Sequence, residues 1–209
     1  NYTWGKALGT NTGDGDFTRI DSLHRFANYS YLDFHRKHNM NINFIYELPK
    51  FAKSRALGYA LNNWQVSGIY TYTSGSPQGV GFSIPGFVNQ NVTGSFTEGA
   101  RARLVGDPTQ GTNGGIFEKI NPAAFLPPQV GSIGVEQSPR IVFLPPINNW
   151  NMTFQKSFTV REGMNLQLRA DAFNFFNHTQ FSDFNRTVNF ANLQSTTATN
   201  FTRALGGFG

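Results

Sequence analysis

The 209-residue sequence contains no cysteine and few charged residues. Without cysteine the chain can form no disulfide, no zinc–thiolate site and no thiolate nucleophile. Aspartate, glutamate, lysine and arginine make up 14% of the residues, whereas about a quarter is usual in a soluble domain. Aromatic residues, in contrast, make up 15% and include 21 phenylalanines. A chain of this composition has a large apolar surface to remove from water.

Long hydrophobic runs are also missing. No stretch approaches the roughly 18 consecutive apolar residues of a membrane-spanning helix, which excludes a helical membrane protein. A membrane β-barrel is not excluded, because its strands alternate apolar and polar side chains. The net charge is +5, but the lysines and arginines form no run of five. We interpret the net charge as serving solvation of the surface or attraction to an anionic surface. We expect no nucleic-acid partner, because basic and aromatic residues are not interleaved.

The clearest pattern lies in residues 149–177, where two alternating segments flank a polar break at 159–163. The alternation has the two-residue period of a strand, and Arg-Glu-Gly in the break supplies turn chemistry. We predict a β-hairpin with strands at 149–158 and 164–176, each about 10 residues long and able to cross a bilayer when tilted. The apolar positions are Trp150, Met152, Phe154, Phe158, Met164, Leu166, Leu168, Ala170 and Ala172.

Three further strands are predicted from shorter patterns. Residues 37–48 alternate strictly, residues 61–73 do so nearly as well, and a short strand is expected within 1–8. Residues 74–148 are rich in glycine, proline and asparagine and are predicted to form a very long loop with short strand-like pieces at 79–84 and 141–144. Loops above about 15 residues tend to be functional or disordered. No strand is predicted in 178–209.

The connections between these strands alternate between long and short. In an up-and-down antiparallel sheet this parity places the short turns at one end and the long loops at the other. Outer-membrane barrels are built in this way. We therefore predict an all-β fold, with an antiparallel up-and-down sheet that is part of a large outer-membrane β-barrel. Residues 1–209 are expected to form a single all-β region with long irregular loops.

Four stretches carry a resemblance to a known family. They are NYTWGKAL from Asn1, DFHRKHNMNINFIYELP from Asp33, NPAAFLPP from Asn121, and NNWNMTFQKSF with LQLRADAFNFFNHTQF within residues 148–181. In this order they resemble the C-terminal part of TonB-dependent outer-membrane receptors, specifically the Oar-like type with an N-terminal carboxypeptidase-regulatory-like domain. The resemblance implies a segment of a plugged transport barrel in the outer membrane.

The resemblance also implies the partners. These are outer-membrane lipid, an unknown substrate held by long extracellular loops, and TonB, which acts through a plug domain that is not among these residues. The closing strand with a terminal aromatic residue, typical of the family, is also not found. The chain is therefore expected to be a C-terminal segment of a longer receptor.

Two alternatives follow from the same alternation. A secreted or released β-rich fragment could assemble with copies of itself into an extracellular filament through open sheet edges. A soluble β-sandwich binding module would bury the apolar faces against each other. An enzyme is not expected, because the sequence has no Ser-His-Asp order, phosphate loop or close carboxylate pair. No catalytic residue and no cofactor is predicted.

Three groups of polar residues are weighed as candidate sites, and none is predicted to bind a metal. His35 and His38, near Asp33, would point to opposite faces of a strand, which makes shared ligation awkward. Arg169 and Asp171 share a face and suit a network on a watery wall better than a dedicated substrate path. Three aspartates in the first glycine-rich loop could hold calcium, but their spacing fits no EF-hand. These are Asp14, Asp16 and Asp21.

Overall fold

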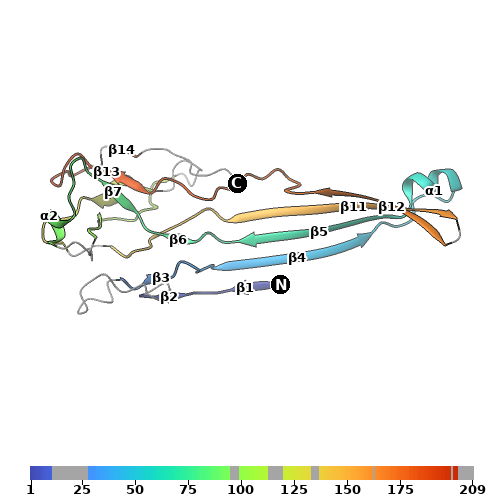
Figure 1. The fold of residues 1–209 in the computed structure, drawn as a ribbon, viewed down its shortest axis with the longest axis horizontal. Coiled ribbons are helices and arrows are strands. Elements are labelled where there is room, and N and C mark those ends of the chain that lie inside the picture. Colours follow the sequence, from blue (N-terminus) through green and yellow to red (C-terminus); the bar gives the residue numbers. More distant parts are fainter. Residues whose placement is uncertain are drawn as a thin grey trace. The chain divides into compact units, whose positions relative to one another are not determined.

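The structure is a computed structural model that describes residues 1–10, 28–94, 99–112, 120–132, 137–161, 163–198 and 200–201. The chain divides into two compact units. Unit 1 contains residues 1–4, 38–73 and 147–180, and unit 2 contains residues 5–37, 74–146 and 181–209. The regular structure of both units is mostly strand, so the predicted all-β class is confirmed (Figure 1).

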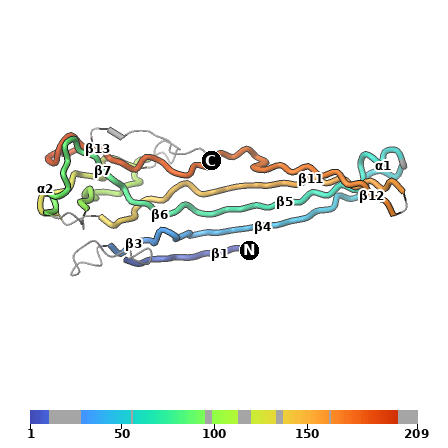
Figure 2. The backbone as a smooth tube through the Cα atoms, viewed as in Figure 1, coloured from blue at the N-terminus to red at the C-terminus, as the bar shows by residue number. Residues whose placement is uncertain are grey.

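Unit 1 is built on one antiparallel sheet of five strands, in the order β1-β4-β5-β11-β12. The strands are β1 (Tyr2–Trp4), β4 (His38–Glu47), β5 (Trp64–Thr73), β11 (Ile147–Arg161) and β12 (Met164–Ala172). Figure 2 shows the backbones of β4, β5 and β11 running next to one another. Within the sheet, spatial order follows chain order, so the predicted up-and-down arrangement is confirmed.

The two predicted strand pairs are both present. β4 pairs with β5 and β11 pairs with β12, each in antiparallel register. The alternation identified these strands because each has one apolar and one polar face.

Two predicted strands were too long and one was too short: β11 runs over Ile147–Arg161, into the predicted break at 159–163. Residues 61–63 are not strand, because helix α1 (Arg55–Leu61) fills the connection and Asn63 has a left-handed φ of 57°. Residues 173–176 are not strand either. There Asn174 has a φ of 47°, and its backbone N–H donates to Oδ1 of Asn151 at 3.0 Å. Asparagine tolerates this conformation and ends the ladder, a local effect that the apolar alternation does not report.

The chain passes between the units only at one end of the sheet. Antiparallel pairing puts the last residues of β1 and β5 at the same end as the first residues of β4 and β11, and four of the five unit boundaries fall at these points. The fifth follows Gln180, beyond the end of β12, and the Gln180 side chain hydrogen-bonds the backbone of Asn148 near the start of β11. The opposite end carries the connection 48–63 and the turn at Gly163, whose φ is +82°. The predicted separation of short turns from long loops is confirmed.

Unit 2 is formed by the long connections and contains only short elements. Its antiparallel pairs are β2 (Leu8–Gly9) with β3 (Ser30–Tyr31), β6 (Pro77–Gln78) with β10 (Val142–Phe143), β8 (Arg103–Leu104) with β9 (Phe125–Leu126), and β13 (Thr187–Asn189) with β14 (Asn200–Phe201). β7 (Gly81–Ser83) runs parallel to β13. Helical elements of its described residues include α2 (Gln90–Thr93) and the 3₁₀ turn Pro122–Ala124.

Unit 2 nevertheless has a hydrophobic core. Its buried side chains come from separate parts of the chain: Val80, Ile84, Ala102, Ile120, Ala124, Phe125, Val142, Phe184, Val188 and Phe190. The expected strand-like pieces at 79–84 and 141–144 contain β7 and β10. The expectation of no strand in 178–209 was wrong, since β13 and β14 lie there. Strands of two or three residues are too short to show a period, so only tertiary packing reveals them.

Candidate functional site

The sheet of unit 1 has two chemically different faces. Residues paired directly across neighbouring strands point to the same side, so the register fixes each face. Ile42, Tyr70 and Trp150 are paired in one row, and Val66, Phe154 and Ala170 lie in another. We call this side the apolar face. It comprises Tyr2, Trp4, Met40, Ile42, Phe44, Tyr46, Trp64, Val66, Gly68, Tyr70, Tyr72, Trp150, Met152, Phe154, Phe158, Met164, Leu166, Leu168, Ala170 and Ala172, with His38, Asn148 and Lys156 as polar exceptions.

Most of the apolar face is not covered by protein within unit 1, although Phe175 and Phe176 lie against Phe154 and Trp150, with ring centroids 5.7 and 5.9 Å apart. Ile42 is 43% exposed and Leu168 is 56% exposed. Across the described residues of unit 1, Lys156 is the only buried side chain. A sandwich would pack such a face against a second sheet, whereas a contiguous exposed apolar surface is typical of an interaction with membrane or protein.

Aromatic side chains flank the apolar face near both strand ends. One row contains Tyr2, Trp4, Tyr70, Tyr72 and Trp150, and the other contains Tyr46, Trp64 and Phe158. From Trp64 to Tyr72 on β5 the distance is about 26 Å at about 3.3 Å per residue. A strand tilt of about 40° gives a height of about 20 Å, close to the roughly 25 Å band between the aromatic girdles of outer-membrane barrels.

The two basic residues on the apolar face lie at these aromatic rows. His38 Nδ1 is 2.8 Å from the Tyr2 hydroxyl. The Lys156 ammonium lies 5.4 Å from the centroid of the Trp64 ring and 5.1 Å from that of Phe158, and it donates to the Asn62 carbonyl. Two ring faces and a carbonyl compensate the loss of hydration of this buried cation. The sequence pattern did not identify Lys156. A lysine at a position where the alternation calls for an apolar residue, close to Trp and Phe, would have indicated it.

Gly68 allows the closest packing in the middle of the apolar face. A Cβ at this position would lie 2.7 Å from Sδ of Met152 and 2.8 Å from the ring of Phe44. The thioether and the ring therefore occupy the space that a side chain at residue 68 would take.

The opposite face, the polar face, carries a hydrogen-bonded network. Asp171 Oδ1 accepts from Thr153 Oγ1 at 2.7 Å and from Arg169 Nε at 3.0 Å. Gln155 Nε2 donates to Gln65 Oε1 at 3.0 Å across β11 and β5. A cavity of about 410 Å³ opens beside the Arg169–Asp171 pair. Both partners of that pair are well exposed, which suits a wall in contact with water.

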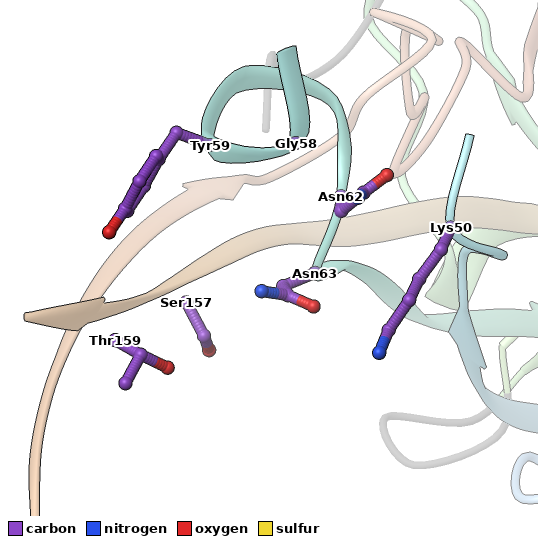
Figure 3. Close-up of a pocket in the computed structure, with 7 residues that line it drawn as sticks. All are labelled: Lys50, Gly58, Tyr59, Asn62, Asn63, Ser157 and Thr159. Atoms are coloured by element: carbon purple, nitrogen blue, oxygen red, sulfur yellow. The ribbon is translucent and has the colours of Figure 1, made fainter. Parts of the chain in front are cut away.

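A smaller pocket of about 230 Å³ lies at the end of the sheet that carries helix α1. It is lined by Lys50, Tyr59, Asn63, Ser157 and Thr159, together with Gly58 and Asn62. Figure 3 shows the side chain of Asn62 turned away from Ser157 and Thr159. This side chain instead makes two hydrogen bonds with the backbone of Ala52, at 3.0 and 2.8 Å. The arrangement presents one amine and several hydroxyl and amide groups.

The other residues weighed from the sequence have separate structural partners. Asp33 forms an ion pair with Arg140. His35 is 3% exposed, stacks on Tyr31 with ring centroids 4.6 Å apart, and accepts a hydrogen bond from the Ala7 N–H at Nδ1. The aspartates at 14, 16 and 21 lie outside the described residues. In the part of the chain that the structure describes, no three metal-ligating side chains gather.

The buried environment of His35 predicts a local pH dependence. Burial lowers the pKa of its imidazole below the ordinary 6.5, and the positive charges of Arg36, Lys37 and Lys6 lower the pKa further. Between the lowered pKa and pH 6.5 the unfolded segment therefore binds more protons than the folded one. The stabilisation that neutral His35 gives the folded segment is complete above pH 6.5 and is lost as the pH falls through that window.

Hydrogen exchange of the Ala7 amide checks this prediction. After correction for intrinsic exchange, protection is expected to be constant from pH 8 to about 6.5 and to decrease below that, because the protonated imidazole no longer accepts from the amide. His35→Phe keeps a stacking ring but removes the acceptor, so its lower protection should not vary with pH. A wild-type profile that is flat down to pH 5 would contradict the assignment.

Among the helices of the described residues, none has both the length and the apolar character needed to cross a membrane.

A largely exposed apolar face between two aromatic rows, backed by a polar face, defines a wall of transmembrane β-barrel type. Residues 1–205 match the family model described as "Outer membrane beta barrel domain", so the chain belongs to this family and is located in the outer membrane. No curated protein and no solved structure matches the chain.

Proposed function

We propose that this chain forms part of the barrel wall of a TonB-dependent transporter of the Oar-like type. The observation that carries the proposal is that neither face of the sheet in unit 1 is packed into a protein core. Its apolar face is exposed between aromatic rows, as contact with lipid requires, and its polar face carries the Thr153–Asp171–Arg169 network, as contact with a water-filled lumen requires. In this role the chain catalyses no reaction and needs no cofactor.

The finer assignment to TonB-dependent receptors is supported by the four resembling stretches, which follow in family order along nearly the whole chain. Three of them overlap strands of the sheet: β1, β4, and the β11–β12 hairpin. The fourth, NPAAFLPP from Asn121, contains the 3₁₀ turn and β9 of unit 2.

We assign the segments of unit 2 to the extracellular side and the short turns to the periplasmic side. Outer-membrane barrels have short periplasmic turns and long extracellular loops. All five passages into unit 2 lie at one end of the sheet, opposite the connection 48–63. Unit 2 then provides the surface that captures substrate, and its hydrophobic core gives these loops a defined shape.

The open sheet edges require further strands. β1 and β12 end the five-stranded sheet, and the smallest barrels have about eight strands. Lipid supplies no water to satisfy the backbone groups of a free edge. The missing partners come from other strands of the same polypeptide in a receptor, and from neighbouring copies in a filament.

Isolation of the natural polypeptide tests the proposal. Peptides from residues 1–209 are expected in an outer-membrane polypeptide much larger than 23.2 kDa that also contains a plug domain. Site-specific photocrosslinkers in that plug should capture TonB. Recovery instead of a 23.2 kDa chain in long assemblies, with no plug and no TonB adduct, would support the filament and reject the transporter.

A further inference from the structure

The connection between β4 and β5 has an unusual combination of charge and exposed apolar groups. Between Leu48 and Asn63 the sequence contains Lys50, Lys53 and Arg55 and no acidic residue. In the same connection Phe51 is 62% exposed, Leu57 58% and Leu61 47%. A turn that faced only water would gain nothing from this many exposed large apolar side chains.

The connection has a defined conformation. The Asn62 side chain joins the start of the segment to its end through its two hydrogen bonds with Ala52. Helix α1 lies between them, and the Gly58 N–H donates to the Ser54 carbonyl at 2.8 Å. These bonds fix the conformation of the turn, and Phe51, Leu57 and Leu61 remain exposed on it.

The connection is also attached directly to the apolar face. Trp64, which lies in the aromatic row at this end, donates its indole N–H to the Ala60 carbonyl at 2.8 Å. Lys156, on the same face, donates to the Asn62 carbonyl. The connection is thus bonded to two side chains of the apolar face at the end of the sheet, while its Gly58 and Tyr59 line the pocket with Ser157 and Thr159 of the polar face.

We infer that the connection 49–61 lies on the membrane surface and binds the anionic phospholipid headgroups of the periplasmic leaflet. Cations of the connection complement lipid phosphates, while Phe51, Leu57 and Leu61 enter the boundary between headgroups and acyl chains. The choice of leaflet rests on the proposed function, which places the short turns in the periplasm. The binding itself rests on the charge of the segment, on its exposed apolar side chains, and on its hydrogen bonds to Trp64 and Lys156 of the apolar face.

Hydrogen exchange in nanodiscs tests the inference. The complete outer-membrane polypeptide that carries residues 1–209 is reconstituted in phosphatidylcholine alone or with about one third phosphatidylglycerol. Each lysine near an anionic surface contributes attraction equivalent to about a fivefold change in binding. We therefore expect the amides of residues 50–61 to exchange at least fivefold more slowly with the anionic lipid, and 0.5 M salt to reduce this difference.

Matched variants separate local binding from net charge. Lys50→Gln with Lys53→Gln should remove most of the lipid-dependent slowing, whereas Lys6→Gln with Lys37→Gln, which removes the same charge from unit 2, should leave it intact. Protection of the β5 amides reports folding, and Lys53→Gln alone, expected to halve the effect or more, is used if the double variant lowers that protection.

Equal exchange in the two lipids, or equal behaviour of the two double variants, would overturn the inference. Since the nanodisc contains neither TonB nor substrate, this outcome would leave the transport proposal untouched.

Discussion

Phe44→Arg is expected to lower the free energy of unfolding in lipid by about 2–4 kcal/mol, whereas Asn43→Arg should change it little. Phe44 pairs with Gly68, midway between the aromatic rows, so an arginine there would lie near the middle of the apolar band. Asn43 pairs with Ile69 on the polar face and is exposed, so a charge there contacts water.

Denaturant titration of the complete polypeptide in phospholipid vesicles measures these differences. Leu166→Arg adds a depth control, because Leu166 pairs with Phe158 in the aromatic row near the turn. Its cost should be only about 0–1 kcal/mol, since charges near the interface reach water. Equal losses for Phe44→Arg and Asn43→Arg would show that the two faces do not differ in their surroundings, and the lipid-facing assignment would fail.

Gly75→Ala is expected to destabilise unit 2 by about 3 kcal/mol, at the upper end of the range for overpacking. A Cβ at this position would lie 1.6 Å from the carbonyl oxygen of Leu144 and 2.5 Å from its carbonyl carbon. Both atoms belong to the backbone, so no side-chain rotation relieves the clash. The segments must separate, which disturbs the 2.9 Å hydrogen bond from the Leu144 N–H to the Ser76 carbonyl and the adjoining β6–β10 pair.

Gly81→Ala is the matched control in the same unit. Its added Cβ meets only Oγ1 of Thr187 at 3.9 Å, an ordinary contact, and its effect should stay within about 0.5 kcal/mol. Native-state hydrogen exchange of core amides such as Val142 and Val188 gives the free energy of opening for both variants. If Gly75→Ala leaves these amides as protected as Gly81→Ala does, the close approach of residues 75 and 144 is wrong.

The sequence and the structure agree best where the pattern is longest. β4 and β11 were recognised because nine or more residues of alternating polarity leave one register that keeps apolar groups together, and a slip by one residue would exchange the faces. Lys156 shows the limit of this reasoning. It sits in the apolar phase, and only the positions of the Trp64 ring, the Phe158 ring and the Asn62 carbonyl explain how a buried cation is tolerated there.

The candidate sites were less predictable than the strands. Asp33 and His35 are close in sequence, and the structure gives them unrelated partners, Arg140 and the Ala7 amide. Such contacts join residues far apart in the chain, and sequence spacing does not encode them. Arg169 and Asp171 could be placed on one face because a strand repeats every two residues, while the contribution of Thr153 from the neighbouring strand required the observed register.

By itself the sequence determined the all-β class, the four long strands, their pairing, and the separation of short turns from long loops. These features follow from the local alternation of polarity and from the rule that alternate connections of an antiparallel sheet lie at the same end. Both can be determined from the order of residues alone. The tertiary structure alone decided that the long connections form a unit with its own core. It also decided that helix α1 is attached to the apolar face through Trp64. Both depend on side chains brought together from distant segments, where burial and hydrogen bonding, not periodicity, select the conformation.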